Sequence, residues 1–284
     1  MINDSELILN KDGSVYHLNL LPEDIAETII TVGDPDRVGK VSQYFDRIEL
    51  QKGKREFITH TGYIGSKRIS VISTGIGTDN IDIVFNELDA LVNIDFTSKL
   101  LKPKLTSLNI IRIGTSGAVQ EDIEMGTILA SSFGIGFDAL MQYYVKPYSV
   151  EEKTLEKAIW EYFPGLYLKP YVAEASTNLL DQYAYDLPKG VTMTSPGFYA
   201  PQGRKVRSEN TFSNLIELAN TFKSKEWRIT NLEMETAGIY ALSRMFGHKA
   251  LSINAILASR VAGQFSSEPD QVVDRAIKLI LERV

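Results

Sequence analysis

The segment LNIIRIGTSGAV, from Leu108 to Val119, places Arg112 inside an apolar run. Because short β-branched runs bounded by glycine are typical of buried strands, residues 109–113 are predicted to form one. A guanidinium buried in such a strand needs partners that offset its lost hydration. Residues 114–117 contain two glycines and two hydroxyls and are predicted to form a loop that binds an anion beside Arg112. The alternative is an edge strand with a solvent-facing Arg112 and an ordinary turn.

Length, composition and charge limit the class of protein. The chain has 284 residues, 44% of them hydrophobic, which is enough for one large core or two modest ones. Its formal net charge of −6 gives no general attraction to nucleic acid or to an anionic membrane, so clustered arginines would serve a local anion. We therefore expect small-molecule partners, and neither nucleic acid nor a membrane.

Three further features of the sequence limit metal binding and location. No cysteine occurs, which excludes disulfides and thiolate metal sites and is typical of a reducing compartment. The three histidines, His17, His60 and His248, show no i,i+4 pairing that would favour zinc. The first residues lack a signal-peptide pattern, and no apolar run approaches the ~20 residues of a membrane span. We expect a cytoplasmic protein without a metal site.

Short apolar strands alternate with amphipathic helices along the chain. Strands are expected at residues 28–32, 69–73, 109–113, 126–131, 191–195 and 250–258. Helices are expected to begin after residues 34, 77, 149 and 231 and to close the chain. No linker, repeat or low-complexity tract divides this series, so we expect one α/β domain over residues 1–284 around a large central sheet.

The residues after the first expected strand, Gly33–Arg37, begin a helix with Asp34 as its N-cap and Pro35 in its first turn. Arg37 then lies in that turn, which is an unfavourable place for a cation because the helix dipole is positive there. A bound anion would remove this conflict. The alternative is an exposed Arg37 paired with Asp34 or Asp36.

Three other segments carry polar groups after an expected strand or at an expected helix start. Residues 74–78 resemble a dinucleotide loop, but the third glycine of that fingerprint is Asn80, so we reject this interpretation. Residues 196–204 contain two aromatic rings, an amide and an arginine, which can stack on a planar ring and hydrogen-bond its edge, although a plain surface loop is the alternative. Residues 231–237 bring two glutamates to a helix start, where acidic residues are usually dipole partners. Together these strand ends could line one site.

Six segments together resemble the nucleoside phosphorylase-I family in their order and approximate spacing. They are Gly33–Arg37, Arg55–Phe57, Ser73–Gly77, Arg112–Thr115, Phe198–Arg204 and Glu233–Glu235. The resemblance covers nearly the whole chain. It implies a single α/β domain with a central mixed, partly closed β-sheet flanked by helices. It also implies a pentosyltransferase that cleaves nucleosides with inorganic phosphate as co-substrate and without a cofactor.

The resemblance also implies a role for individual residues. The phosphate site would contain Gly33, Arg37, Arg112, Thr115 and, from a neighbouring subunit, Arg55; the base site Phe198, Gln202 and Arg204; and the ribose site Glu233, Met234, Glu235 and the neighbour's counterpart of His17. Because two of these residues reach a neighbour's site, the smallest competent unit would be a homodimer. A hexamer built as a trimer of dimers is the larger alternative.

The sequence departs from the bacterial pattern of this family in two places. Ala200-Pro201 and Gly203 stand where that pattern more often has Pro-Gly and Glu, which changes the outline of the base pocket more than its chemistry. Asn80 stands where a serine contributes to an intersubunit potassium site in some bacterial hexamers. The second change puts an intersubunit potassium, and with it the hexamer, in doubt.

Phosphorolysis develops positive charge on the ribose and negative charge on the departing base, so positioning and electrostatics supply most of the catalysis. We expect Arg112 to hold phosphate, Glu235 to hold the ribose and balance its charge, and Gln202 and Arg204 to take up charge on the base. No residue need form a covalent bond.

The last apolar strand indicates which base is cleaved. The resemblance implies that a purine enzyme would have an aspartate after this strand to protonate the departing base. Residues 255–261 include no acid, whereas Arg260 can stabilise a pyrimidine oxygen. We therefore expect uridine to be cleaved to uracil and α-D-ribose 1-phosphate, as in pyrimidine salvage. The alternatives are a purine phosphorylase, a hydrolytic nucleosidase of the same superfamily and a non-catalytic nucleoside sensor.

Overall fold

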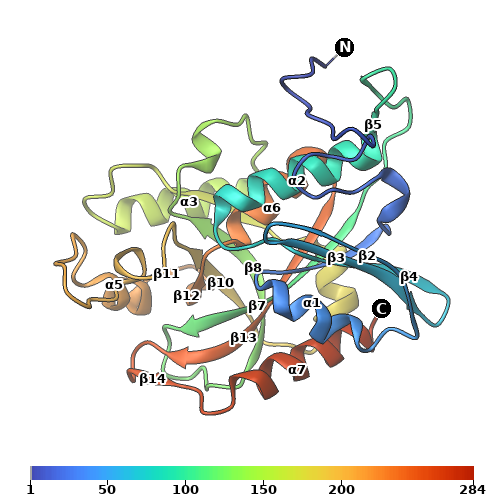
Figure 1. Cartoon of the computed structure of the whole chain (residues 1–284). Helices are drawn as coiled ribbons and strands as arrows, with labels where there is room; N and C mark the ends of the chain where they lie inside the picture. The colour runs from blue at the N-terminus through green and yellow to red at the C-terminus, as the bar shows by residue number, and fades with distance from the viewer. Residues whose placement is uncertain (1) are drawn as a thin grey trace.

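A mixed twelve-stranded β-sheet forms the centre of the molecule, and helices flank it (Figure 1). This computed structural model describes residues 2–284. The strands are β1 (Thr28–Val32), β2 (Arg47–Lys54), β3 (Phe57–Ile64), β4 (Lys67–Ser73), β5 (Ile94–Asp95), β6 (Leu100–Leu101), β7 (Asn109–Ala118), β8 (Ile128–Gly136), β9 (Tyr171–Glu174), β10 (Lys189–Thr194), β11 (Lys223–Ser224), β12 (Trp227–Glu233), β13 (Lys249–Ser259) and β14 (Gln264–Phe265). The α-helices are α1 (Pro35–Ser42), α2 (Thr78–Asn93), α3 (Val150–Tyr162), α4 (Thr177–Tyr183), α5 (Leu215–Thr221), α6 (Thr236–Phe246) and α7 (Pro269–Leu281), with 3-10 turns at Pro22–Asp24, Leu140–Gln142 and Ala200–Gln202.

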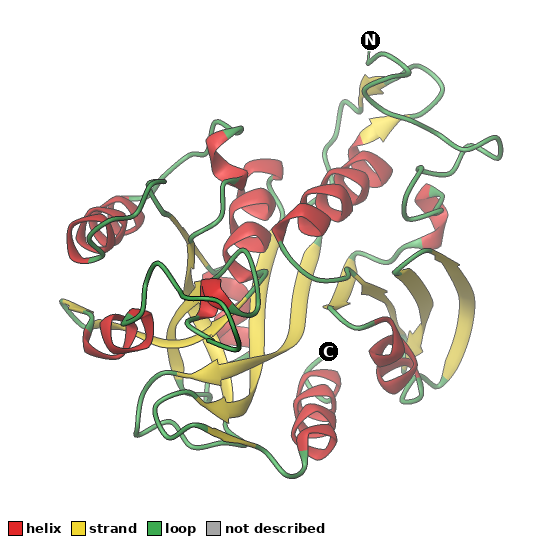
Figure 2. Cartoon of the chain, turned by 60° about the vertical axis from the view of Figure 1, so that its left-hand side comes forward, coloured by secondary structure: helices red, strands yellow, loops and turns green. Residues whose placement is uncertain are grey.

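The sheet is closed at one end and open at the other. Its strand order is β11-β12-β10-β8-β13-β7-β1-β4-β3-β2, and β12 also pairs with β7. That extra antiparallel pairing joins Leu232 to Gly117 and Asn231 to Ala118. The strands β12, β10, β8, β13 and β7 therefore form a closed ring, which we call the barrel, while β1, β4, β3 and β2 extend from it (Figure 2). The predicted mixed, partly closed sheet is confirmed.

Helices cover the sheet on several sides. Helix α6 contacts β8, β9, β10 and β13, and α2 packs on α6. Helix α7 runs along β7 and β13, while α1 contacts β3 and β4 (Figure 1). Within residues 2–284, no helix combines the length and apolar character needed to cross a membrane.

The core explains why the central strands are continuous apolar runs. All five residues of β1 are buried, because it pairs in parallel with β4 on one side and β7 on the other while helices cover its faces. The main core joins residues of β1, β4, β7 and β13 to the apolar faces of α2, α6 and α7. A second core lies between β10, β12, α3 and α5.

The predictions for β1 and for the starts of α1, α2 and α3 are confirmed. Strand β1 has the predicted bounds. The Asp34 carboxylate accepts from the Asp36 N–H at 3.0 Å, with Pro35 in the first turn of α1. Ser149 and Glu152 form the capping box that opens α3. These starts are predictable because each depends on groups within four residues of one another. The helix expected after residue 231 is wrong in its start, because residues 227–233 form β12 and α6 begins only at Thr236.

The loop predicted at residues 114–117 is wrong, because β7 continues through Ala118. Strand β13 pairs with β7 along its whole length, from Lys249 opposite Asn109 to Ser259 opposite Ala118. Gly114 is needed for space instead of flexibility, since a Cβ there would lie 2.0 Å from Nη1 of Arg112. Arg112 therefore lies within a long barrel strand and not at its end.

Strand β8 is also longer than predicted, ending at Gly136 instead of Ser131. Its extension pairs with β10 on one side and β9 on the other. Gly134 lies in this extension, and a Cβ at that position would come 2.7 Å from the Ala237 Cα of α6. The glycine is present because it lets α6 approach β8 closely, and it does not mark the end of the strand.

Candidate active site

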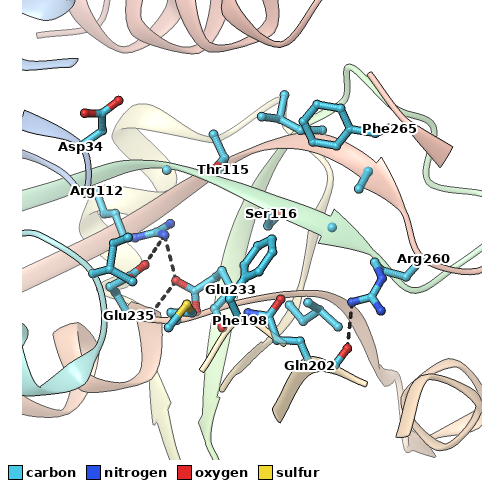
Figure 3. A pocket seen from close by; sticks show the side chains of 18 of the residues that line it. Asp34, Arg112, Thr115, Ser116, Phe198, Gln202, Glu233, Glu235, Arg260 and Phe265 are labelled. Atoms are coloured by element: carbon cyan, nitrogen blue, oxygen red, sulfur yellow. Dashed lines mark hydrogen bonds and ion pairs between the residues drawn. The ribbon is translucent and has the colours of Figure 1, made fainter. Parts of the chain in front are cut away.

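One cavity of about 960 Å³ brings together most of the residues predicted to bind substrates. The predicted residues that line it are Gly33, Arg37, Arg112, Thr115, Phe198, Gln202, Arg204, Glu233, Met234, Glu235 and Arg260. Figure 3 shows Asp34 and Arg112 at one end and Gln202 and Arg260 at the other. The cavity lies where β1, β7, β12 and β13 deliver their carboxyl-terminal residues, which is the usual place for a ligand in an open α/β sheet.

Arg112 is 5% exposed, and buried acceptors surround it. Its Nη2 lies 2.7 Å from Glu235 and 2.9 Å from Glu233. Its Nη1 donates to Ser252 Oγ at 3.3 Å and to Asn254 Oδ1 at 3.2 Å. Burial alone would lower the pKa of Arg112, but the two carboxylates outweigh it and raise the pKa. The predicted buried arginine with partners is confirmed, and the exposed alternative is wrong.

Glu235 joins the glycine-containing loop after β4 to the start of α6. Its Oε1 accepts from the Gly77 N–H at 2.8 Å, while its Oε2 accepts from Arg112. Burial raises the pKa of Glu235, although Arg112 acts in the opposite direction. The carboxylate faces the cavity and can accept hydrogen bonds from a ligand's hydroxyl groups.

Glu233 is occupied by donors from the protein itself. Its carboxylate accepts from Thr194 Oγ1 at 2.7 Å, from the Glu235 N–H at 2.9 Å and from the Thr236 N–H at 2.9 and 3.1 Å. Arg112 adds a charged contact. Glu233 thus fixes both Arg112 and the first turn of α6, and its predicted role at the ribose stays a prediction.

Arg37 provides a second cation near Arg112. It lies in the first turn of α1, as predicted, and its Nη1 is 3.4 Å from the Ile113 carbonyl oxygen. Burial lowers the pKa of Arg37, and the like charge of Arg112 adds to this effect, whereas Asp34 opposes it. With Gly33 and Thr115 beside them, the two guanidinium groups form a concave site suited to an anion.

At the opposite end, the loop after β10 holds an amide and an aromatic ring. Gln202 is 2% exposed, and its Nε2 donates to the Glu233 carbonyl oxygen at 3.3 Å. Arg204 donates to Gln202 Oε1 at 2.5 Å and to the Phe198 carbonyl oxygen at 2.7 Å, and its guanidinium lies 3.7 Å above the Phe198 ring. Burial and then the charge of Arg260 lower the pKa of Arg204 to about 10.

Arg260 holds this loop from the end of β13. Its Nη1 donates to the Gln202 carbonyl oxygen at 2.8 Å (Figure 3). Burial lowers the pKa of Arg260. Phe265 on β14 is 67% exposed and also lines the cavity, so this part of the wall has an apolar ring that the sequence did not single out.

His17 and Arg55 lie outside the cavity and near each other. Nδ1 of His17 is 2.6 Å from Glu87 Oε1, and the His17 ring meets Tyr16 edge-on. Arg55 occupies the exposed turn between β2 and β3, with its guanidinium 6.0 Å from the Tyr16 ring. These two residues share one surface, which is compatible with their predicted entry into a neighbour's site.

The sequence did not lead us to Ser252 and Asn254, although both contact Arg112. The sequence feature that could have found them is the one that pointed to Arg112, since both are polar residues at alternate positions within an apolar strand. No group of His, Asp and Glu side chains within residues 2–284 has the arrangement of a metal site.

Comparisons with known proteins agree with this geometry. The family described as the phosphorylase superfamily matches residues 27–283. The chain is similar to the uridine phosphorylase of Thermococcus kodakarensis, with 29% identity over 276 residues that cover 96% of this chain and 88% of that protein. A DeoD-type purine nucleoside phosphorylase of Alkaliphilus metalliredigens is 33% identical over 261 residues, covering 90% and 92%. The crystal structure of a Trypanosoma brucei nucleoside phosphorylase, which its authors describe as showing uridine phosphorylase activity, matches with a TM-score of 0.88, 29% identity and 98% of both chains.

Proposed function

Because the chain belongs to the phosphorylase superfamily, we propose that it cleaves uridine with inorganic phosphate to uracil and α-D-ribose 1-phosphate. The observation that carries this proposal is buried Arg112, which pairs with Glu235 at one end of the cavity, while Gln202 offers its amide at the other. The enzyme would be a cytoplasmic pentosyltransferase of pyrimidine salvage. Phosphate is its co-substrate, and the reaction needs no other cofactor.

The phosphate would bind to Arg37 and Arg112, with Gly33 and Thr115 completing its contacts. Arginine suits this task because its planar fork binds two phosphate oxygens and stays charged. Arg112 and Arg37 together only balance the charges of Glu233 and Glu235, so a phosphate dianion needs another cation. Arg55 from a neighbouring subunit would supply it.

The ribose would lie against Met234 and Glu235, between phosphate and base. During the reaction a phosphate oxygen bonds to C1′ as the bond from C1′ to N1 breaks, and the electron pair of that bond goes to uracil. Glu235 holds the ribose hydroxyls, and its negative charge stabilises the positive charge on the ring. The neighbour's counterpart of His17 would contact the 5′-hydroxyl.

The uracil would face Gln202 and Arg204, with Phe198 packed on its ring. An amide offers both a donor and an acceptor, which match the N3–H and oxygen edge of uracil. Arg204 and, through its hold on the Gln202 backbone, Arg260 stabilise the negative charge that develops on the base. A protonating acid is therefore not required.

Uridine is favoured over purine nucleosides by the end of β13. The similarity to a DeoD-type purine enzyme keeps a purine substrate as the rival. However, β13 ends in Ser259 and is followed by Arg260, so it offers no carboxyl group to protonate a departing purine. A purine would also leave buried polar groups of the base site unpaired, at about 1–3 kcal/mol each.

A substrate panel tests the proposal directly. Uridine, inosine and adenosine are incubated with and without phosphate, while base release and the sugar product are followed. We expect phosphate-dependent release of uracil with ribose 1-phosphate as product, and a kcat/KM for uridine far above that for inosine. A ratio near one or in favour of inosine would indicate a purine enzyme, free ribose a hydrolase, and binding without turnover a sensor.

A further inference from the structure

A chain of hydrogen-bonded polar side chains passes through all five strands of the barrel. It runs from Arg112 on β7 to Asn254 on β13, Ser131 on β8, Thr192 on β10, Asn231 on β12 and back to Ser116 on β7, with successive distances of 3.2, 2.8, 2.6, 2.9 and 2.9 Å. We call these six residues the polar belt. Its four middle members are fully buried, whereas both ends, Arg112 and Ser116, line the cavity.

The hydrogen bonds of the belt share one direction, and Arg112 sets it at the first amide. Because a guanidinium has no acceptor, Asn254 must turn its Oδ1 to Arg112 and its Nδ2 to Ser131. Thr192 donates its one proton to Asn231 Oδ1, so Ser131 must donate to Thr192. The donors therefore all point the same way around the barrel, and such a chain is mutually polarising.

We propose that Asn254 is a positioning residue that orients Arg112 for phosphate. This inference rests on the proposed role of Arg112 as the phosphate ligand. The carboxylates hold only Nη2, so the acceptors on Nη1 determine how the guanidinium plane is rotated about that contact. Ser252, the other Nη1 acceptor, also pairs its hydroxyl with Thr236 at 2.8 Å.

The register of the barrel supports this role. Asn254 lies directly opposite Gly114 in the pairing of β13 with β7. Since a Cβ at Gly114 would overlap the guanidinium, the glycine makes the space in which Arg112 reaches the amide. An apolar side chain at residue 254 would fill a buried strand position without needing partners, whereas a buried amide must have all its groups satisfied. The sequence thus keeps both a glycine and an amide where a structural strand needs neither.

The test compares two substitutions in the belt. Asn254→Ala removes one of the two acceptors of Arg112 Nη1. Thr192→Val breaks the belt at a residue that contacts neither Arg112 nor the cavity. Phosphate binding is measured by titration calorimetry, thermal unfolding gives the stability of each variant, and steady-state kinetics give separate KM values for phosphate and uridine. If Asn254→Ala does not fold, Asn254→Ser takes its place. The serine hydroxyl oxygen is one bond closer to the backbone than the amide oxygen of asparagine.

We expect Asn254→Ala to weaken phosphate binding about tenfold, because a hydrogen bond to a charged group is lost. Its phosphate KM should rise by the same factor while its uridine KM stays within twofold of the unmodified enzyme. Thr192→Val should lower the midpoint of unfolding and leave phosphate binding within twofold. Equal weakening by both substitutions, or none by Asn254→Ala, would overturn the inference.

The two proposals fail in different ways. Asn254-dependent phosphate binding by a chain that does not cleave uridine would support the positioning role and overturn the proposed function. Uridine cleavage with an unchanged phosphate KM in Asn254→Ala would do the reverse.

Discussion

Single residues determine how charge is distributed in the cavity. Arg112 is held by Glu233 and Glu235, and the two carboxylates have different partners. Glu233 is saturated by backbone and hydroxyl donors, so it serves as a fixed counter-charge. Glu235 accepts from one backbone N–H and from Arg112, which leaves capacity for a ligand. Two neighbouring glutamates thus differ in their capacity to accept from a ligand, because their surroundings differ.

Replacing Arg112 should affect phosphate most strongly. We expect Arg112→Ala to lower phosphorolysis by on the order of 10²-fold or more, because it removes a charge-assisted contact to the anion. Arg112→Lys keeps the charge without the planar fork and should retain part of the activity. Steady-state kinetics with varied phosphate measure both, and unchanged phosphate KM and kcat in folded Arg112→Ala would contradict the assignment.

The raised pKa of Glu235 predicts the acid limb of the pH profile. As the pH falls through that pKa, Glu235 gains a proton and can no longer balance positive charge on the ribose. Activity should therefore be lost with a midpoint above 4.5, the ordinary value for glutamate. Glu235→Gln should show low activity without this limb. A profile of kcat/KM against pH measures it, and an identical limb in Glu235→Gln would assign the titration to another group.

Strand β7 continues through glycines, which usually interrupt a strand. Gly114 and Gly117 lie within it, and its pairing with β13 nevertheless continues to Ala118. A glycine is unfavourable in a strand unless something occupies the space of the missing side chain. Here the guanidinium of Arg112 occupies that space beside Gly114.

Gly114→Ala should therefore damage the site more than the fold. The added methyl group would displace the guanidinium from its acceptors, so we expect weaker phosphate binding and lower kcat with a modest change in stability. Gly39→Ala is the matched control, because a Cβ at that exposed position in α1 meets nothing within 4 Å. It should leave kinetics unchanged and stabilise the protein by roughly 0.5–1 kcal/mol. Normal phosphate KM in Gly114→Ala would show that the guanidinium does not fill this space.

Local signals were predictable from the sequence, and long-range ones were not. The caps at Asp34 and Ser149 were predictable because they depend on adjacent residues. The extension of β7 was not predictable, since residues 114–117 have the composition of a turn. Only their pairing with β13 shows that they form a strand. Most of the candidate site could be located because its residues stand in short polar or glycine-containing segments beside apolar runs, although Arg112 and Thr115 lie within β7 and not after it. Asn254 was missed because its partner Arg112 is 142 residues away.

At the scale of the whole molecule, the residues assigned to the proposed site divide between the cavity and a separate surface. Arg37, Arg112, Gln202 and Glu235 line the cavity of one chain, whereas Arg55 lies elsewhere on it. The charges of Arg37 and Arg112 cancel those of Glu233 and Glu235. A second subunit that contributes Arg55 would therefore provide the attraction that phosphate needs.

Mixing two impaired variants tests this arrangement. Arg55→Ala removes the contributed cation, and Glu235→Gln disables the cavity of the chain that carries it. After subunit exchange, each mixed dimer would own one site in which both residues are intact, so activity should return. Mixing each variant with itself is the control. If exchange is demonstrated by labelled subunits and no activity returns, the site does not draw on a neighbour.

Closure of the barrel also imposes an order on synthesis of the chain. Arg112 leaves the ribosome 140 residues ahead of Ser252 and 123 ahead of Glu235. At 5–20 residues per second, translation takes on the order of ten seconds to supply these partners. During that interval β7 has an unpaired edge and an uncompensated charge, which are hazards for a nascent strand. The carboxyl-terminal half must therefore fold before the edge of β7 is paired and the charge of Arg112 is compensated. A chain cut short before β13 should depend on chaperones.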